Sequence, residues 1–470
     1  MNLFAALFRL EWFRLVRSRL LLISLIAFTA IAAGAIHTGR VAMQVRGQQL
    51  DSIRNAYQRD FQAQWQLIND TTPAGKAKAG SAGIAAVVNF RLPQNALWQP
   101  RSLQTLSGGI SDVQPFYYAV QTTTNYTEPP NIPVSNPVRL FAGNFDLAFV
   151  WLYLLPLLII AYGYPLYAEE QERGTAALLS IQGRSLRRII AVKLLFRITL
   201  ISVLVAGINV AGFIASPGQL TTAEVVAWLS VTQGYILLWA AIVWLIVSLR
   251  TGSTLAALLL TATWLVTTIV APAVSNIYVA ARYPVPLRSE LASLQRHESE
   301  QIWSMPPRVL VDSFNAAHPQ YAGSSNPAKD TVGISTRFVA GYYYLLEKRV
   351  QRAAITQERE LTQRNQYFAQ MAAINPVLHT QQQYNQLAGS GFDDYQHYRR
   401  QVAAFQQQWK GFLYPFQLAD QRLGTAEFQS FPVFNEARAI GNTGITYGLY
   451  ILIAVTMAAG YVLFNRKKAI

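Results

Sequence analysis

Residues 167–193 read YAEEQERGTAALLSIQGRSLRRIIAVK and lie between two long apolar segments. Three glutamates precede Gly174, a short apolar run follows it, and basic residues come last. Glycine readily adopts the backbone angles that end a helix. Gly174 therefore predicts a helix end, and Thr175 is a suitable N-cap for a short helix through Leu178 and Leu179. The glutamates before it would favour the positive end of that helix.

The composition places the chain among membrane proteins. Of its 470 residues, 52% are hydrophobic and only 13% are charged, which is too apolar for an ordinary soluble protein. The chain has no cysteine, so it has neither a disulfide framework nor a thiolate metal site.

The net charge of +15 is distributed unevenly along the chain. Residues 39–144 carry +4, residues 280–442 carry +3, and the remaining residues carry +8. The basic residues of that last group all flank apolar segments on the same predicted side. This is the pattern of cytoplasmic loops in membrane proteins, and it argues against a nucleic-acid-binding surface.

Six apolar segments are long enough to cross most or all of a bilayer. They are residues 20–36, 147–167, 189–214, 225–249, 255–279 and 444–464. The preceding residues 2–19 combine aromatic side chains with four arginines, which predicts a helix lying in the membrane interface. A cleaved signal peptide is the alternative for this region, because Ala33-Gly34-Ala35 resembles a cleavage site.

The two long insertions are predicted to be mainly helical and to form one extracytoplasmic domain. In the first, Ile53, Tyr57, Phe61 and Trp65 recur every four residues, which predicts a helix continuing outward from the first span. In the second, an apolar stripe predicts one buried helix face. Its residues are Tyr395, Tyr398, Val402, Phe405, Trp409 and Phe412.

The predicted fold class is thus an all-α membrane protein with six transmembrane helices, an N-terminal interfacial helix and a helical domain built from two insertions. The predicted regions are 1–38 (interfacial helix and first span), 39–144 (first insertion), 145–279 (spans two to five, with the cytoplasmic loop 168–190), 280–442 (second insertion) and 443–470 (sixth span and basic tail).

The stretch 167–193 resembles the cytoplasmic coupling loop of ABC-2 type transporter permeases. The matching residues are Glu169, Glu170, Glu172, Gly174, Thr175, Leu178, Leu179, Ser180, Arg184, Ser185 and Lys193. The chain departs from the family at Ile181-Gln182-Gly183, where a proline is frequent, and at Val192, where a glycine is frequent. The long insertions are similar to those of the subgroup with a large extracytoplasmic domain.

The resemblance implies a bacterial inner-membrane permease subunit of an ATP-driven exporter, with cytoplasmic N- and C-termini. Its partners would be a cytoplasmic ABC ATP-binding subunit that holds ATP-Mg, a second permease subunit (identical or related) and the lipid bilayer. Whether a periplasmic partner also binds is left open by the resemblance. Leu178 and Leu179 would dock to the ATPase, and Gly174 would form the bend. Charge pairing with the ATPase would involve Glu169, Glu170 and Glu172. Thr175, Arg184 and Arg187 complete the expected coupling residues.

No catalytic chemistry is predicted for the chain itself. The sequence contains no phosphate-binding loop, no zinc-protease motif and no nucleophile elbow, and its five histidines lack metal-ligand spacing. We therefore expect no cofactor and no metal on this chain.

Energy is expected to come from a partner. No Asp, Glu or His lies in the middle of a predicted span, which disfavours an ATP-independent, ion-coupled carrier. Lys193 and Arg197 lie near the inner end of their span, from which long side chains can reach water. The main alternative function is a membrane-anchored scaffold that acts through its extracytoplasmic domain. In that case, the stretch 167–193 would be an ordinary charged loop.

Overall fold

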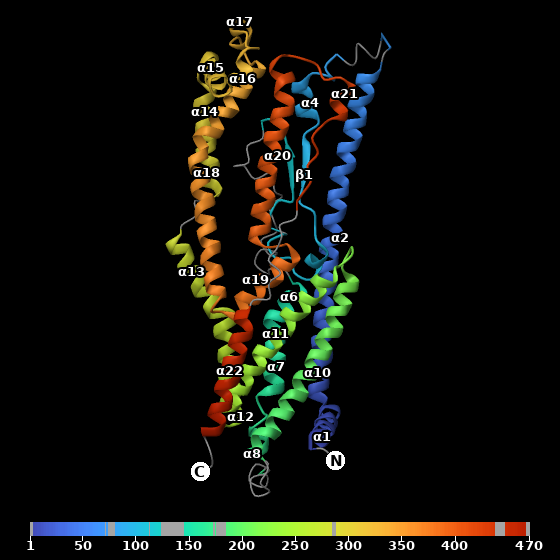
Figure 1. The fold of residues 1–470 in the computed structure, drawn as a ribbon, viewed down its shortest axis with the longest axis vertical. Helices are drawn as coiled ribbons and strands as arrows, with labels where there is room; N and C mark the ends of the chain where they lie inside the picture. Colours follow the sequence, from blue (N-terminus) through green and yellow to red (C-terminus); the bar gives the residue numbers. More distant parts are fainter. Residues whose placement is uncertain are drawn as a thin grey trace.

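We analysed a computed structural model of the chain. It describes residues 3–70, 72–73, 80–111, 113–123, 145–172, 174, 185–283, 288–437 and 447–466. The molecule is elongated, and most of its helices run along the long axis (Figure 1). The helix α1 (Leu3–Arg17) and the last turn of α22 (Tyr447–Arg466) lie at one end. We call this the terminal end, and the opposite half the distal part.

Five helices of the described residues are long and apolar enough to cross a membrane. They are Arg19–Asn69, Leu147–Glu172, Leu186–Ala215, Thr222–Val247 and Ser253–Arg282. The helix α22 has a shorter apolar part, Tyr450–Asn465, and packs beside α11 (Thr222–Val247). The chain is therefore a predominantly α-helical membrane protein, and each of these helices coincides with a predicted apolar segment.

The first long helix, α2 (Arg19–Asn69), begins beside the membrane bundle and ends in the distal part (Figure 1). The side chain of Ser18 caps its start by accepting a hydrogen bond from the backbone N–H of Leu21 at 3.4 Å. Its 51 residues are helical throughout, so the predicted continuation of the helix beyond the first span, through Tyr57 and Trp65, is confirmed.

Two of the membrane-length helices contain a π-helical turn immediately before a proline. The turn η2 (Val150–Leu154) precedes Pro156 at the start of α7 (Leu155–Gly163), and η3 (Val266–Val270) precedes Pro272 at the start of α13 (Ala271–Arg282). Because proline has no N–H, it leaves a carbonyl of the preceding turn without its helical partner.

Side chains from neighbouring helices satisfy carbonyls in both π-helical turns. The Tyr235 hydroxyl donates to the Leu152 carbonyl at 2.9 Å. The Asn375 side-chain amide donates to the Thr267 carbonyl at 2.8 Å. Such pairing is required inside a bilayer, where no water is present to take its place.

The remaining elements of the membrane bundle are one uninterrupted helix, α10 (Leu186–Ala215), and three shorter pieces. These pieces are α6 (Leu147–Phe149) before η2, α8 (Ala168–Glu172) after α7, and α12 (Ser253–Leu265) before η3. Buried tryptophans fill the bundle, and the indole N–H groups of Trp151 and Trp228 both donate to the Asn209 side-chain oxygen, at 3.2 and 2.9 Å.

The distal part is helical apart from one small sheet. From the first insertion come α4 (Ala85–Arg91), β1 (Gln94–Leu97), η1 (Ser102–Thr105) and β2 (Tyr117–Val120). From the second come α14 (Arg288–Trp303), α15 (Pro307–Ala317), α16 (Pro319–Ala322), α17 (Pro327–Asp330), α18 (Thr336–Ala372), α19 (Pro376–Ala388), α20 (Phe392–Leu418) and α21 (Thr425–Gln429). The two strands pair antiparallel, with Gln94 opposite Val120 and Leu97 opposite Tyr117.

The two insertions share a hydrophobic core. The stripe on α20, including Tyr398 and Trp409, packs against Val88, Trp98 and Tyr118 of the first insertion. The aromatic residues near the end of α2 pack against the same cluster. Apolar faces of the two insertions are therefore buried together in one hydrophobic cluster.

The helix α19 joins this distal part to the membrane bundle. Its residues Val377, Tyr384 and Ala388 belong to the same core as the membrane helices. The Tyr384 ring centroid lies 4.4 Å from that of Trp228, and the Tyr384 hydroxyl lies 2.9 Å from the Thr232 hydroxyl. The boundaries 280–442 treat the second insertion as separate from the membrane helices. In the structure, part of this insertion packs in the core of those helices.

Candidate functional site

The acidic part of the stretch 167–193 forms a short helix at the terminal end. Residues 164–167 turn the chain out of α7, and α8 (Ala168–Glu172) carries the three glutamates. Gly174 has φ of +70° and its N–H donates to the Gln171 carbonyl at 3.0 Å. The helix thus ends where the glycine predicts.

Six charged side chains from three elements meet beside α8, and we call this group the hub cluster. Its members are Glu11, Arg14, Glu169, Glu170, Lys193 and Arg197. The first two lie on α1, the middle two on α8 and the last two on α10. Three negative and three positive charges make the cluster formally neutral.

Glu11 lies at the centre of the hub cluster. Its carboxylate is 3.1 Å from Arg14 Nη1, 3.1 Å from Arg197 Nη2 and 3.7 Å from Lys193 Nζ. Arg197 also donates to the Tyr162 carbonyl at 2.5 Å. The α1 helix is thereby connected through its one carboxylate to the spans on either side of the acidic stretch.

The glutamates of α8 complete the cluster. Glu170 Oε1 accepts a hydrogen bond from Lys193 Nζ. The Glu169 carboxylate lies 3.6 Å from Arg14 Nη1 and 3.8 Å from Arg197 Nη2. Glu172 lies outside the cluster and accepts a hydrogen bond at 3.0 Å from the hydroxyl of Ser253, the first residue of α12. The three glutamates of one short helix therefore hold α1, α10 and α12.

Three of the charged side chains in the hub cluster are almost completely buried, so their pairing matters for the stability of the protein. Glu11, Glu170 and Lys193 are only 3, 4 and 3% exposed. A buried charge without its partner costs several kcal/mol, so these groups favour the arrangement in which all of them are paired. The expectation that Lys193 and Arg197 extend to water is wrong for the described structure, because Glu11 and Glu170 provide internal partners.

The structure thus divides the predicted coupling residues. Glu170 points inward and pairs within the chain, whereas the Glu169 side chain is 30% exposed and Glu172 lies at an exposed contact. Arg187 contacts α22: its Nη1 donates to the Asn465 side chain at 2.5 Å, and its guanidinium lies 4.3 Å from the Tyr461 ring centroid. Thr175, Leu178, Leu179 and Arg184 lie outside the described residues.

Sequence reasoning missed Glu11 and Arg14. One signal was present, since Glu11 is the only acidic residue among the first 50. A lone carboxylate in a basic, aromatic helix at a membrane surface indicates a specific partner. Nothing in the sequence indicated that this partner lay more than 180 residues away.

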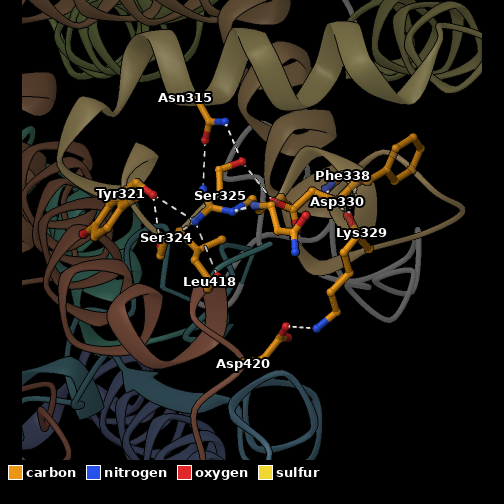
Figure 2. Close-up of polar contacts among 12 residues, drawn as sticks. Asn315, Tyr321, Ser324, Ser325, Lys329, Asp330, Phe338, Leu418 and Asp420 are labelled. Carbon is orange, nitrogen blue, oxygen red and sulfur yellow. Dashed lines mark hydrogen bonds and ion pairs between the residues drawn. The ribbon is translucent and has the colours of Figure 1, made fainter.

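Figure 2 shows a second polar cluster, in the distal part, whose members include Asn315, Tyr321 and Asp330. Arg337 belongs to this cluster and is 1% exposed. Its guanidinium donates to the Asn315 side chain at 2.8 Å and to the Tyr321 carbonyl at 2.8 Å, and its Nε lies 3.1 Å from the Asp330 carboxylate. Burial lowers the pKa of Arg337 and the Asp330 charge partly opposes this. With an ion pair between Lys329 and Asp420 alongside, the cluster joins α15, α16 and α17 to α18 and the end of α20. Arg337 Nε has the ion-pair contact with Asp330 but no hydrogen bond, and the other guanidinium nitrogens donate within the chain. We assign the cluster a structural role.

Comparison with known proteins gives one match. Residues 289–436 match a protein family described as "Domain of unknown function (DUF3526)". The match covers about a third of the chain and corresponds to α14 through α21 and the segment that follows. Neither a curated protein nor a solved structure matches the chain. The comparisons therefore identify a recognised domain in the distal part and leave the membrane portion to be interpreted from its own residues.

Proposed function

We propose that the chain is the membrane-spanning permease subunit of an ATP-driven ABC exporter, in which a separate subunit hydrolyses ATP. The observation that carries this proposal is the hub cluster. Buried ion pairs hold α10 to the acidic helix α8, which leads into the proposed coupling loop, and to α1. A more exposed pair, Glu169 with Arg14, joins α8 to α1 directly.

This arrangement suits a subunit that receives force at one short loop. A partner that moves the residues after Gly174 would move α8, and α8 is held to α10 by Glu170 and to α12 by Glu172. Buried, paired charges resist separation, so the attached helices would move together. Exposed ion pairs, such as those of an ordinary surface loop, contribute little to stability and would not hold the helices together in this way.

The proposal includes six spans, with both termini and α8 in the bacterial cytoplasm and the distal part outside. Its support is the position of the basic residues, which flank the apolar segments at the terminal end. A second permease subunit, identical or related, would complete the transporter. The substrate would be moved by changes in the spans that the ATPase drives.

The topology can be tested by labelling single cysteines, because the chain has none of its own. We expect a membrane-impermeant maleimide added to intact cells to label Ser81→Cys and Gly323→Cys, and to label Ser180→Cys only after lysis. Ser81 and Gly323 are exposed in the distal part, and a side chain at Gly323 meets no other atom within 4 Å. Labelling of Ser180→Cys on intact cells would contradict the proposed orientation.

The function itself is tested by purifying the full chain from its native membrane with mild detergent. We expect an ABC ATPase to co-purify in stoichiometric amount and ATP hydrolysis to follow it through size-exclusion chromatography. Recovery of the chain without an ATPase, but with a protein bound to the distal part, would favour the scaffold function instead. Recovery of the chain alone, with transport activity in vesicles that lack ATP, would favour a carrier.

A further inference from the structure

A cleft in the distal part lies beside the free edge of the small sheet. It has a volume of about 940 Å³ and lies between α2, β1 and residues 428–436, the segment that includes the end of α21. Figure 1 shows β1 between α20 and α2. Cavities that bind ligands have volumes of roughly 300–1,000 Å³, so this cleft is large enough for one.

The backbone of β1 presents hydrogen-bonding groups to this cleft. The Trp98 N–H donates to the Phe116 carbonyl at 2.8 Å. In an antiparallel pair, only every second residue forms hydrogen bonds with the neighbouring strand. The residue of β1 that bonds to β2 before Trp98 is therefore Ala96. The N–H and C=O groups of Asn95 and Leu97 therefore point away from β2. Both residues line the cleft. Among the described residues, no strand pairs with β1 on this side.

The Glu436 carboxylate already accepts a hydrogen bond from this edge of the sheet, as a carbonyl of an added strand would. The backbone N–H of Gln99 is the next donor along it, and it donates to the Glu436 carboxylate at 2.6 Å. Glu436 thus occupies the position that a carbonyl of a third strand would take opposite Gln99. The edge is consequently capped at Gln99, whereas no strand pairs with Asn95 or Leu97 on this side in the described residues.

The rest of the lining suits the side chains of a peptide. Apolar surface comes from three phenylalanines: Phe61 of α2, and Phe431 and Phe434 of the segment after α21. Arg54 and Arg101 lie on the same wall, and Arg54 Nη2 donates to the Gln99 side chain at 2.7 Å. Both guanidinium groups already have carboxylate partners, since Arg54 lies 3.0 Å from Asp51 and Arg101 lies 3.5 Å from Asp394. The lining therefore offers mainly apolar surface and polar backbone groups to a ligand.

We propose that this cleft binds an extended peptide segment of another protein, which pairs with β1 as a third strand. The backbone groups of Asn95 and Leu97 would supply the main-chain hydrogen bonds, and alternate side chains of the peptide would contact the phenylalanines. Binding by strand addition has this division of labour: the backbone bonds provide affinity and the pockets provide specificity. The inference concerns a site in the distal part and does not depend on the transport proposal.

The experiment removes one backbone donor from the edge. In Asn95→Pro, the N–H that faces the cleft is lost, while the ladder to β2 is kept, since proline is tolerated where the N–H faces away from a neighbouring strand. Asn95→Ala is the matched control, because it changes the same side chain and keeps the N–H. Purified full-length protein in detergent is incubated with a mixture of capped heptapeptides randomised over Val, Thr, Phe, Ser, Lys and Glu. Bound peptides are identified by mass spectrometry.

We expect the wild type and Asn95→Ala to enrich the same peptides, and Asn95→Pro to bind them at least tenfold more weakly. The proposal is overturned if Asn95→Pro binds them as the wild type does, or if no peptide is enriched. Binding of maltopentaose in place of peptides would likewise overturn it, since the cleft would then be a carbohydrate site.

A second measurement leaves the protein unchanged and so avoids any effect of proline on folding. An enriched heptapeptide is resynthesised with backbone N-methyl groups at its odd positions or at its even positions. Only one of the two sets directs its N–H groups toward β1. We expect one set to weaken binding at least tenfold and the other to change it less than threefold. Equal effects of both sets would show that the peptide does not bind as a strand.

Discussion

Replacing Leu178 and Leu179 with Asp is expected to abolish capture of the ATPase while the chain inserts and folds normally. The sequence places these leucines after Gly174, in the loop between α8 and α10. An apolar anchor buried at an interface contributes about 1.5–3 kcal/mol, so removing two of them, and burying charge in their place, weakens binding by at least about 100-fold. The measurement is the amount of ATPase retained on the immobilised full-length chain.

The matched control for this pair is Leu178→Met with Leu179→Met, which keeps both side chains apolar and of similar size. We expect this control to retain the ATPase at close to the wild-type amount. Size-exclusion profiles of both double variants establish that the spans and the distal part have folded. If the aspartate pair retains the ATPase in full, the loop is not the docking element and the proposed function loses its attachment point.

Lys193→Ala is expected to lower the free energy of unfolding by about 3–5 kcal/mol, the cost of leaving a buried charge without its partner. Lys193 pairs with both Glu170 and Glu11, and its removal leaves three carboxylates with two cations at a site where Glu11 and Glu170 are almost inaccessible to water. The measurement is unfolding in mixed detergent and denaturant, followed by tryptophan fluorescence.

Two controls separate this electrostatic effect from a general loss of packing. Arg188→Ala removes an exposed cation from the same helix, and we expect a change within about 0.5 kcal/mol. Glu170→Gln combined with Lys193→Gln keeps the cluster neutral, and we expect the double variant to be markedly more stable than Lys193→Ala. The paired-charge account fails if the double variant is as unstable as the single one.

Most of the helical framework could be predicted because each apolar segment carries its own local signal. The predicted segments 189–214 and 225–249 agree with α10 and α11 to within a few residues at each end. The helix end at Gly174 was likewise predictable, because it depends on the properties of one residue type. The continuation of α2 beyond the first span followed from a four-residue periodicity that needs no knowledge of its neighbours.

The features that escaped prediction depend on contacts between distant parts of the chain. The π-helical turns before Pro156 and Pro272 accept hydrogen bonds from Tyr235 and Asn375, which come from distant parts of the chain. The hub cluster joins Glu11 to residues more than 180 positions later. The four-residue strands β1 and β2 are too short for a reliable alternation pattern. In all of these cases the missing information was which residues become neighbours.

The position of α19 has a mechanical consequence. It is a short crosspiece seated in the core of the membrane helices, and a long helix departs from each of its ends into the distal part (Figure 1). At about 1.5 Å per residue, the 37 residues of α18 form an arm of about 55 Å, so a tilt of about 5° at α19 displaces the far end by about 5 Å. The 27-residue helix α20 forms the shorter arm. A small tilt of α19 within the spans thus becomes a larger displacement at the end of α18 that is farthest from the membrane helices. This amplification requires that α19 stay attached to the membrane helices. Asn375 and Tyr384 provide that attachment through their hydrogen bonds with Thr267 and Thr232.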